Sequence, residues 1–521
     1  MRDEGVDRYD RHIRLAEKVT GQKAGALVDK FMARVLVTGD AAWLQSPEGR
    51  LTALTAANLI ARFCPRIDFD FRGAETMQRE ALDLVQRIDR RPVAEFRSLT
   101  EEVSWVDYEA VLCLGRTGRV SPNATSVIAR GWLAAVSSSG PPPALPDAPY
   151  NPFGPILGAC FGAAEVFKRL LHAGPQKLAF LEPSVFSAYS YQVWDAGGTL
   201  DSRPALPQEI ELPATLLAGA GAVGNAFGYA LAEVPGVHGE LAIVDREDVE
   251  DETNLNRYSL GLHDDACGPV HSRKVDLIDR VLKSTRVRCV PHKEEIEAYL
   301  KRLFAQEESR PRAIISAVDN NDIRPSLQRL WPDILIEGAT SDSLFQVSRH
   351  AYAEGLACLM CIHTIESTAD ARPYEEFVAE RSGLSPTAIR QALRDADRVV
   401  TEVDIAAAPE EKRAFLRHRL GRSICTVLSE LEKLSADPNS VPAAATVSFV
   451  SMAAGTLAAA ELVKCAAGLG SPLETLYQMD MFMPFENAML LPTEKLRSCE
   501  CYRRHHVHDR YRAIVYGRDD V

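Results

Sequence analysis

The sequence predicts an α/β protein with two doubly wound parallel sheets, one in each half of the chain. Short β-branched strands alternate with helical stretches, and the same order of strands and helices occurs twice. The clearest internal echo aligns the segment AAEVFK at residues 163–168 with the segment AAELVK at residues 459–464. We therefore expect two copies of one domain, the first at residues 1–205 and the second at residues 206–521.

The individual elements follow from these patterns of apolar residues. In the first copy we expect strands in RVLVTGD, RIDFDF and YEAVLCLG and helices in RLTALTAANLIARF and GACFGAAEVFKRLL, with a proline-rich loop at residues 141–152. In the second copy we expect strands in ATLLAGAGAVG, GELAIVD and RAIISAVD and helices in NAFGYALAEV and GTLAAAELVK.

The composition is that of an ordinary globular protein, with 521 residues of which 46% are hydrophobic and 25% charged. A formal net charge of −13 without a long basic run excludes nucleic acid as the main partner. No uninterrupted apolar stretch reaches the length of a membrane span, and the polar start MRDEGVDRYDRHIRL differs from a signal peptide. We therefore expect a cytoplasmic protein that binds no membrane, whose 11 cysteines are thiols or metal ligands.

A nucleotide-binding turn is expected at the start of the second copy. The pattern Gly219-x-Gly221-x-x-Gly224 follows a strand and opens a helix, and Asp245 ends the next strand 21 residues later (245 − 224 = 21). Such glycines allow the backbone to approach a phosphate, and the helix N-terminus attracts the anion. The pattern by itself suits NAD, FAD or ATP equally.

The first copy differs at the corresponding turn, where Gly39-Asp40-Ala41-Ala42 replaces the three glycines. An aspartate at this position repels a phosphate, because both are negatively charged. We therefore expect that the first copy has lost its nucleotide site and serves as a scaffold.

Residues further along the second copy favour ATP. Asn254 and Arg257 follow Asp245 on an expected loop, and Lys274 comes next in HSRKVDLIDR. Asp319 and Asn320 end the strand in SAVDNNDIR. Two cations suit a triphosphate, and a carboxylate at a strand end suits Mg²⁺.

These stretches resemble the ubiquitin-activating enzymes and their bacterial relatives, the ThiF/MoeB-type adenylyltransferases. The matching segments are the glycine turn, VDREDVEDETNLNR, Lys274, SAVDNNDIR, the closing helix SMAAGTLAAAELVK and the opening RYDRHIRL. The resemblance covers residues 206–503 and, more weakly, residues 8–170. It implies two Rossmann-like ThiF-type domains, the first inactive and the second active, with a helical catalytic-cysteine insertion at about residues 365–440.

The resemblance also implies roles for single residues. Gly219, Gly221 and Gly224 border the phosphates of ATP, Asp245 holds the ribose, Asn254, Arg257 and Lys274 contact the phosphates, and Asp319 carries Mg²⁺. An extra residue between Asp245 and Asn254 leaves open whether Glu247 or Asp248 takes the second acidic position of the family. Relatives also bring an arginine into the ATP site from a neighbouring subunit or pseudo-domain. The match is Arg11, which is otherwise an ordinary surface arginine.

Four cysteines form a candidate zinc site. Cys358-x-x-Cys361 and Cys499-x-Cys501 lie far apart in the sequence but have the spacing of a closed, structural Cys₄ site. Relatives usually carry CxxC at the second place, so His505, His506 or His508 remains an alternative to one thiolate. We expect Cys267, Cys289 and Cys465 to be core thiols.

A further cysteine, Cys425 in GRSICTVLSE, stands where thioester-forming relatives place their nucleophile. Arg422 nearby favours the thiolate, which is the reactive form. The alternative is a thiol that packs an apolar helix face.

Together these features predict an activating enzyme for a ubiquitin-like protein, most like those of bacterial conjugation operons associated with phage defence. In this reaction ATP adenylates the C-terminus of the partner, and Cys425 captures the acyl group as a thioester. A conjugating enzyme then receives the acyl group. An oligomer of the activating enzyme is compatible with this role. A sulfur-carrier adenylyltransferase is the first alternative, against which the helical insertion and the fused inactive copy count. A non-catalytic binding module is the second, and a redox dehydrogenase is more distant.

Overall fold

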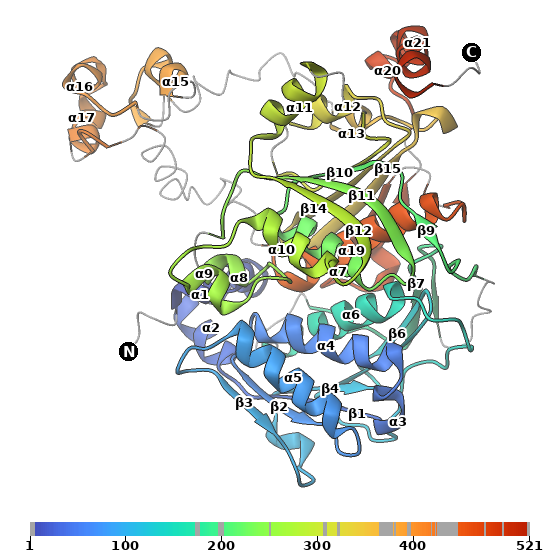
Figure 1. Ribbon diagram of the computed structural model, residues 1–521. Coiled ribbons are helices and arrows are strands. Elements are labelled where there is room, and N and C mark those ends of the chain that lie inside the picture. The colour runs from blue at the N-terminus through green and yellow to red at the C-terminus, as the bar shows by residue number, and fades with distance from the viewer. Residues whose placement is uncertain are drawn as a thin grey trace. The chain divides into compact units, whose positions relative to one another are not determined.

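The computed structural model describes residues 6–171, 178–195, 203–249, 252–305, 310–319, 323–363, 379, 382–392, 398–417, 419–422, 424, 446–471, 473, 476–491 and 494–517. The chain divides into two compact units: Met1–His363 with Ala445–Val521, and Thr364–Ala444. The larger unit contains both β-sheets (Figure 1).

The first sheet lies within residues 1–205. Its strands are β1 (Val35–Gly39), β2 (Arg66–Asp70), β3 (Glu95–Ser98), β4 (Ala110–Leu114), β5 (Ala124–Arg130), β6 (Leu133–Ser137), β7 (Ser184–Ser187) and β8 (Val193–Asp195). The helices of this half are α1 (Val6–Thr20), α2 (Ala24–Phe31), α3 (Ala41–Leu44), α4 (Pro47–Ala61), α5 (Glu75–Ile88) and α6 (Phe153–Leu171).

The second sheet lies within residues 206–521. Its strands are β9 (Ile210–Glu211), β10 (Thr215–Ala218), β11 (Val237–Val244), β12 (Arg286–His292), β13 (Ala313–Ser316), β14 (Ile334–Ser341), β15 (Leu344–His350), β16 (Leu476–Asp480) and β17 (Met489–Leu491). Its helices are α7 (Ala222–Ala232), α8 (Glu252–Leu255), α9 (His263–Cys267), α10 (Lys274–Leu282), α11 (Ile296–Ala305), α12 (Arg324–Gln328), α13 (Leu359–His363), α19 (Ser448–Ala466), α20 (Glu500–Arg503) and α21 (His505–Tyr516).

The two sheets have the same topology. The first has the strand order β3-β2-β1-β4-β5-β6-β7-β8, and the second has β12-β11-β10-β13-β14-β15-β16-β17, with β9 paired to β11. In both sheets the first five strands of this order are parallel and the last three are antiparallel. The predicted internal repeat is therefore confirmed.

The antiparallel strands correct the expectation of purely parallel sheets. β5 and β6 are joined by Gly131 and Trp132 alone, and β14 and β15 by Asp342 and Ser343 alone. Gly131 and Asp342 have positive φ values of 55° and 54°, as tight hairpins require. A two-residue connection reverses the chain, whereas a parallel pair needs a long crossover.

Helices α6 and α19 are equivalent elements of the two halves, since α6 precedes β7 and α19 precedes β16. Each carries the aligned Ala-Ala-Glu motif and a fully buried ion pair, Glu165 with Lys168 and Glu461 with Lys464. The hydroxyl of Tyr191, from the first half, donates to Glu461 at 2.6 Å. Equivalent buried ion pairs therefore lie in both halves, and the pair of the second half also bonds the first half.

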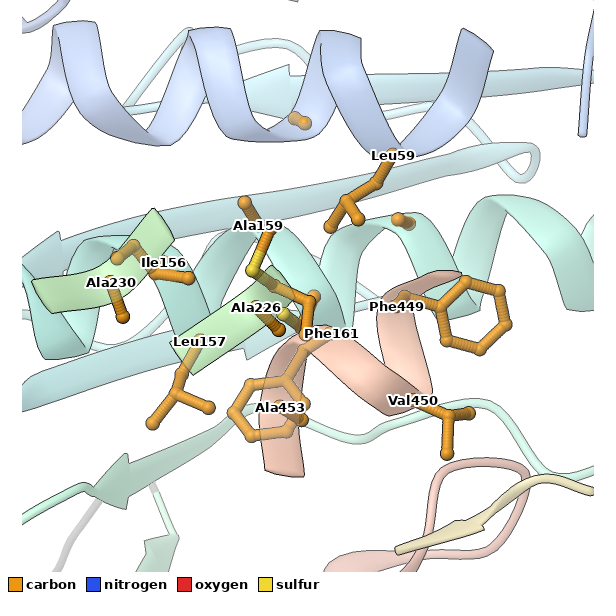
Figure 2. Close-up of a cluster of buried hydrophobic side chains, with 14 of the residues drawn as sticks. Leu59, Ile156, Leu157, Ala159, Phe161, Ala226, Ala230, Phe449, Val450 and Ala453 are labelled. Atoms are coloured by element: carbon orange, nitrogen blue, oxygen red, sulfur yellow. The ribbon is translucent and has the colours of Figure 1, made fainter. Parts of the chain in front are cut away.

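The two halves share one hydrophobic core. α6 packs against α4 and α19, and α19 packs against α7, so that helices of both sheets meet in one layer. Figure 2 shows Leu59 of α4, Phe161 of α6, Ala226 of α7 and Phe449 of α19 within this layer. The layer places the first half directly against the helix that follows the glycine turn.

By length and composition alone α19 could cross a membrane, contrary to the expectation from uninterrupted apolar runs. In the fold, 89% of its apolar window is buried inside the protein, and it carries the buried Glu461 and Lys464. These properties are those of a core helix.

The unit Thr364–Ala444 contains the helices α15 (Pro386–Ala392), α16 (Glu402–Ala407) and α17 (Glu410–Arg417). A small apolar cluster that includes Leu384, Ile389, Ile405, Leu416 and Ile424 holds them together. This is the range in which the sequence predicts the helical insertion. The domain assignment itself, at 1–205 and 206–521 with an insertion at about 365–440, stays a prediction.

Candidate nucleotide site and cysteine cluster

The glycine turn follows β10 and opens α7. Gly219 has a φ of +93°, and a Cβ there would lie 2.6 Å from the carbonyl oxygen of Ala317. A Cβ at Gly224 would lie 2.2 Å from the carbonyl oxygen of Gly219. At Gly221, in contrast, an added Cβ meets nothing within 4 Å. Two glycines are therefore required by packing, and the third leaves space in front of the turn.

Gly221 is also the N-cap of α7, and no side-chain cap of this helix occurs among the described residues. The first N–H groups of an eleven-residue helix therefore remain available to an anion at the open glycine. Asp245, at the end of β11, lies beside the same turn and accepts hydrogen bonds from the N–H groups of Ala220 at 2.7 Å and Glu247 at 2.9 Å. Burial raises the pKa of Asp245, although both hydrogen bonds act in the opposite direction.

Two cations share one aromatic ring near the turn. The guanidinium carbon of Arg257 lies 5.3 Å from the ring centroid of Tyr258, and Nζ of Lys274 lies 5.4 Å from it. Lys274 is 5% exposed and donates to Glu247. Burial acts to lower the pKa of Lys274, but Tyr258 and Glu247 outweigh it and raise the pKa to about 12. Lys274 is therefore a positive charge at neutral pH.

The structure separates the two candidates for the second acidic position. Glu247 pairs with Lys274, whereas Asp248 pairs with Lys293 at 2.7 Å. Glu247 is therefore the acid bonded to a cation of the candidate site, and its assignment to the second acidic position stays a prediction.

Buried polar atoms without hydrogen-bond partners lie on the same loop. Asn256 is 1% exposed, and neither Oδ1 nor Nδ2 has a partner among the described atoms. The Nε atom of Arg257 is also buried without a hydrogen-bond partner among the described atoms. Asn254, which precedes these residues in α8, is buried as well. Buried polar groups of this kind need a partner, and a polar ligand such as a nucleotide supplies one. The residues present thus fit ATP.

Asp319 is exposed three residues after the end of β13. β13 pairs in parallel with β10, and Ala218 lies opposite Ser316, so Asp319 and the glycine turn leave the same edge of the sheet. An exposed carboxylate at this edge is a suitable ligand for Mg²⁺. Asn320 lies outside the described residues.

Arg11 is half-buried in α1, and α1 packs against α8, the helix of Asn254. The helix that carries Arg11 thus contacts a segment of the candidate site. The contribution of Arg11 to that site stays a prediction.

The first half has the opposite charges at the equivalent edge. Asp40 caps α3 by accepting the N–H of Trp43 at 2.8 Å. Thr38 pairs with Cys113 as Ala218 pairs with Ser316, which places Arg116 where the second half has Asp319. The first half thus has the acid Asp40 at its turn and the cation Arg116 at the position equivalent to Asp319. This arrangement supports the expected loss of nucleotide binding, which stays a prediction.

The four cysteines of the predicted metal site come together in a buried cluster with Trp331 and Tyr352. Sγ of Cys358 lies 3.8 Å from Cys361 and 3.5 Å from Cys499, and Sγ of Cys361 lies 3.4 Å from Cys501. A tetrahedral zinc with Zn–S bonds of about 2.3 Å requires sulfur separations of about 3.8 Å. The donor set and its dimensions therefore fit a structural metal ion.

The histidine alternative does not enter this group of ligands. Within the described residues, the group of donor atoms consists of the four cysteine sulfurs. His508 stacks on Trp331 instead, with ring centroids 3.8 Å apart. The N–H of Leu496 donates to Sγ of Cys361 at 3.4 Å, a contact that favours a thiolate.

Other cysteines differ from expectation. Cys267 and Cys465, expected in the core, are exposed, and Cys289 is half-buried. Cys267 ends the short α9, and Cys465 lies in the last turn of α19, where that helix leaves the core.

Cys425, the predicted nucleophile, lies outside the described residues. Its neighbour Ile424 is fully buried in the smaller unit and donates its N–H to the carbonyl of Arg398 at 2.9 Å.

A buried charge cluster that was not predicted from the sequence lies beside the strand end. Glu337 of β14 is fully buried and accepts hydrogen bonds from Arg324 and, at 2.6 Å, from His363. Burial acts to raise the pKa of Glu337, but His363 and Arg324 outweigh it and hold the pKa below its usual value. Arg324 also donates to the carbonyl of Val318 at 3.0 Å, next to Asp319. The signal in the sequence was the acid Glu337, which follows the apolar run ILI at residues 334–336.

Comparison with known proteins places this site in a family. The family model described as "ThiF family" matches residues 205–501, more than half of the chain. The chain belongs to the ThiF family. The match spans the glycine turn, Arg257, Lys274, Asp319 and all four clustered cysteines. An ATP-dependent, adenylyltransferase-like activity is the function that fits this family.

One curated relative is an uncharacterized protein, y4jF, of Sinorhizobium fredii (strain NBRC 101917 / NGR234). It is 28% identical over 481 residues, which are 87% of this chain and 86% of the relative. Among solved structures, E. coli MccB with MccA-N7isoASN is 15% identical with a TM-score of 0.36, over 56% of this chain and 67% of that chain. E. coli MccB with ATP is 14% identical with a TM-score of 0.34, over 56% and 66%. TM-scores this low carry no functional argument.

Two glycines of the turn in this ThiF-family protein should respond differently to replacement by alanine. Gly224→Ala should destabilise the protein by about 2 kcal/mol or more, because its Cβ clashes with backbone. Gly221→Ala should change stability by less than about 1 kcal/mol but weaken MgATP binding, because its methyl group fills the open space. Thermal unfolding and titration calorimetry with MgATP measure the two effects. Undiminished MgATP binding by Gly221→Ala would show that no phosphate approaches this glycine.

The cysteine cluster should bind one zinc per chain. Replacing Cys358 and Cys361 together by serine should remove the metal and lower the melting temperature, because structural zinc stabilises the fold that holds it. Elemental analysis by mass spectrometry measures the zinc. Cys289→Ser is the control, since it removes a thiol outside the cluster. Full zinc content in the double variant would reject these ligands.

Proposed function

We propose that the protein is an activating enzyme for a ubiquitin-like protein. It uses ATP to adenylate the C-terminal carboxylate of its partner and then forms a thioester that a conjugating enzyme receives. The observation that carries the first step is the open glycine turn together with two cations on the ring of Tyr258 and a carboxylate at the same sheet edge as the turn. A dinucleotide dehydrogenase does not need this combination.

The roles of the residues follow from their positions. Gly221 and the N-terminus of α7 bind phosphate oxygens, and Asp245 accepts the ribose hydroxyls. Lys274 leaves Glu247 and bonds the phosphates instead. Arg257 is the second cation at the phosphates, and Arg11 from the first half is the third. Asp319 would hold Mg²⁺, which supplies positive charge to the phosphates when it is bound. A carboxylate oxygen of the partner then attacks the α-phosphorus, and pyrophosphate leaves with the electrons of the broken P–O bond.

The second step belongs to Cys425 in the smaller unit. Its thiolate attacks the carbonyl carbon of the acyl adenylate, a C–S bond forms, the C–O bond to the phosphate breaks, and AMP leaves. The separate helical unit and the resemblance to activating enzymes of bacterial conjugation operons support this step and a role in antiphage defence. Zinc at the cysteine cluster would be structural.

Asp319→Ala should reduce exchange of labelled pyrophosphate into ATP by about 100-fold or more, because the phosphates lose metal-borne charge. The assay contains wild-type protein, MgATP and a ubiquitin-like protein encoded beside its gene. Asp107→Ala, which removes an exposed acid of the first half, is the control and should leave the exchange unchanged. Equal rates of pyrophosphate exchange in the wild type and in Asp319→Ala would show that Asp319 takes no part in the reaction.

Cys425→Ala should retain pyrophosphate exchange but lose the covalent adduct with the partner, because adenylation and thiol capture use different residues. In the wild type the adduct should survive a denaturing gel and disappear with reducing agent. Cys425→Ser should trap a more stable oxyester. An adduct that persists in Cys425→Ala assigns the chemistry to another cysteine, and active adenylation without any adduct favours the sulfur-carrier alternative.

A further inference from the structure

Arg62, the residue that ends α4 in the first half, is fully buried. Its guanidinium donates to main-chain carbonyls of the second half: those of Leu255, of Ser259 at 2.9 Å and of Gly261 at 3.2 Å. A buried arginine is stable only when its donors are bonded, so these carbonyls and the side chain hold one another in place.

Asn58, one turn earlier in α4, completes the arrangement. It is 4% exposed, and its Oδ1 accepts the Nε–H of Arg62 at 2.8 Å. Its Nδ2 donates to the carbonyl of Ser259 at 3.0 Å. Asn58 therefore orients the guanidinium and bonds one of the same carbonyls.

The bonded carbonyls bracket the part of the candidate site that meets the phosphates. The loop at residues 254–261 (the 254–261 loop) carries Asn254, Asn256 and Arg257, and the ring of Tyr258 contacts both Arg257 and Lys274. From the second half, Arg280 bonds the carbonyl of Leu260 at 3.0 Å. The first half thus supplies bonds at the beginning, middle and end of this loop.

We propose that Arg62, oriented by Asn58, is a positioning residue for ATP. It acts through the 254–261 loop and touches neither nucleotide nor partner. The first half, whose own turn carries Asp40, thereby sets the geometry of the nucleotide site of the second half. This inference rests on the proposed adenylation by that site. The effect on binding should be large, because a small misplacement of charged groups weakens their interaction with phosphates.

The test compares Arg62→Gln, Arg62→Lys and wild type by MgATP titration calorimetry and by amide hydrogen exchange without nucleotide. Arg62→Gln should weaken MgATP binding by about 10-fold or more and speed exchange in residues 254–261. Arg62→Lys should restore part of the affinity, because lysine keeps the charge but not the fork of donors. Arg34→Gln is the matched control, since Arg34 bonds Asp68 and Glu95 within the first half. It should change neither measurement.

If Arg62→Gln does not fold, Asn58→Ala serves in its place, since it removes one bond to Ser259 and the orienting acceptor but leaves the guanidinium. Unchanged MgATP affinity in a folded variant, or unchanged exchange of the 254–261 loop, would overturn the proposal. So would equal effects of Arg34→Gln, which would indicate general destabilisation. If the wild-type protein binds no MgATP, the proposed function is overturned instead. In that case hydrogen exchange still decides whether Arg62 holds the 254–261 loop.

Discussion

The packing of α6 and α19 between the two sheets is the constraint on which the larger unit depends. Each helix belongs to one copy of the repeat, each buries a glutamate–lysine pair, and the two share one core with α4 and α7. Because this layer is common to both halves, the position of α4 is fixed relative to α7 and to the glycine turn. Arg62, at the end of α4, can therefore bond a loop almost 200 residues away in the sequence.

The two halves share one sheet topology but carry different charges at equivalent edges. Both sheets offer a strand edge with the same connectivity, where doubly wound folds bind ligands. In the second half that edge carries an open glycine turn, two cations and Asp319. In the first half Asp40 and Arg116 reverse these charges. The first half retains the packing surface and the bonds to the 254–261 loop, which need neither a glycine turn nor a metal ligand.

Sequence patterns predicted the features whose residues lie close together in the chain. The strand–turn–helix at Gly219, the repeated motif that holds Glu165 and Glu461, and each of the two cysteine motifs are recognised from spacing within short segments. The antiparallel edge was missed because its hairpins are marked by single residues, Gly131 and Asp342. Contacts between distant segments, such as Glu247 with Lys274 or Arg62 with the 254–261 loop, depend on the tertiary packing and leave no periodic signal in one sequence.

The central claim is that the second half binds ATP rather than a dinucleotide, and titration calorimetry of the wild-type protein with MgATP and, separately, with NAD tests it most directly. The geometry of the glycine turn, Lys274, Arg257 and Asp319 predicts one MgATP per chain, affinity that falls when magnesium is withheld, and no measurable heat with NAD. Saturable binding of NAD without any response to MgATP would contradict the account.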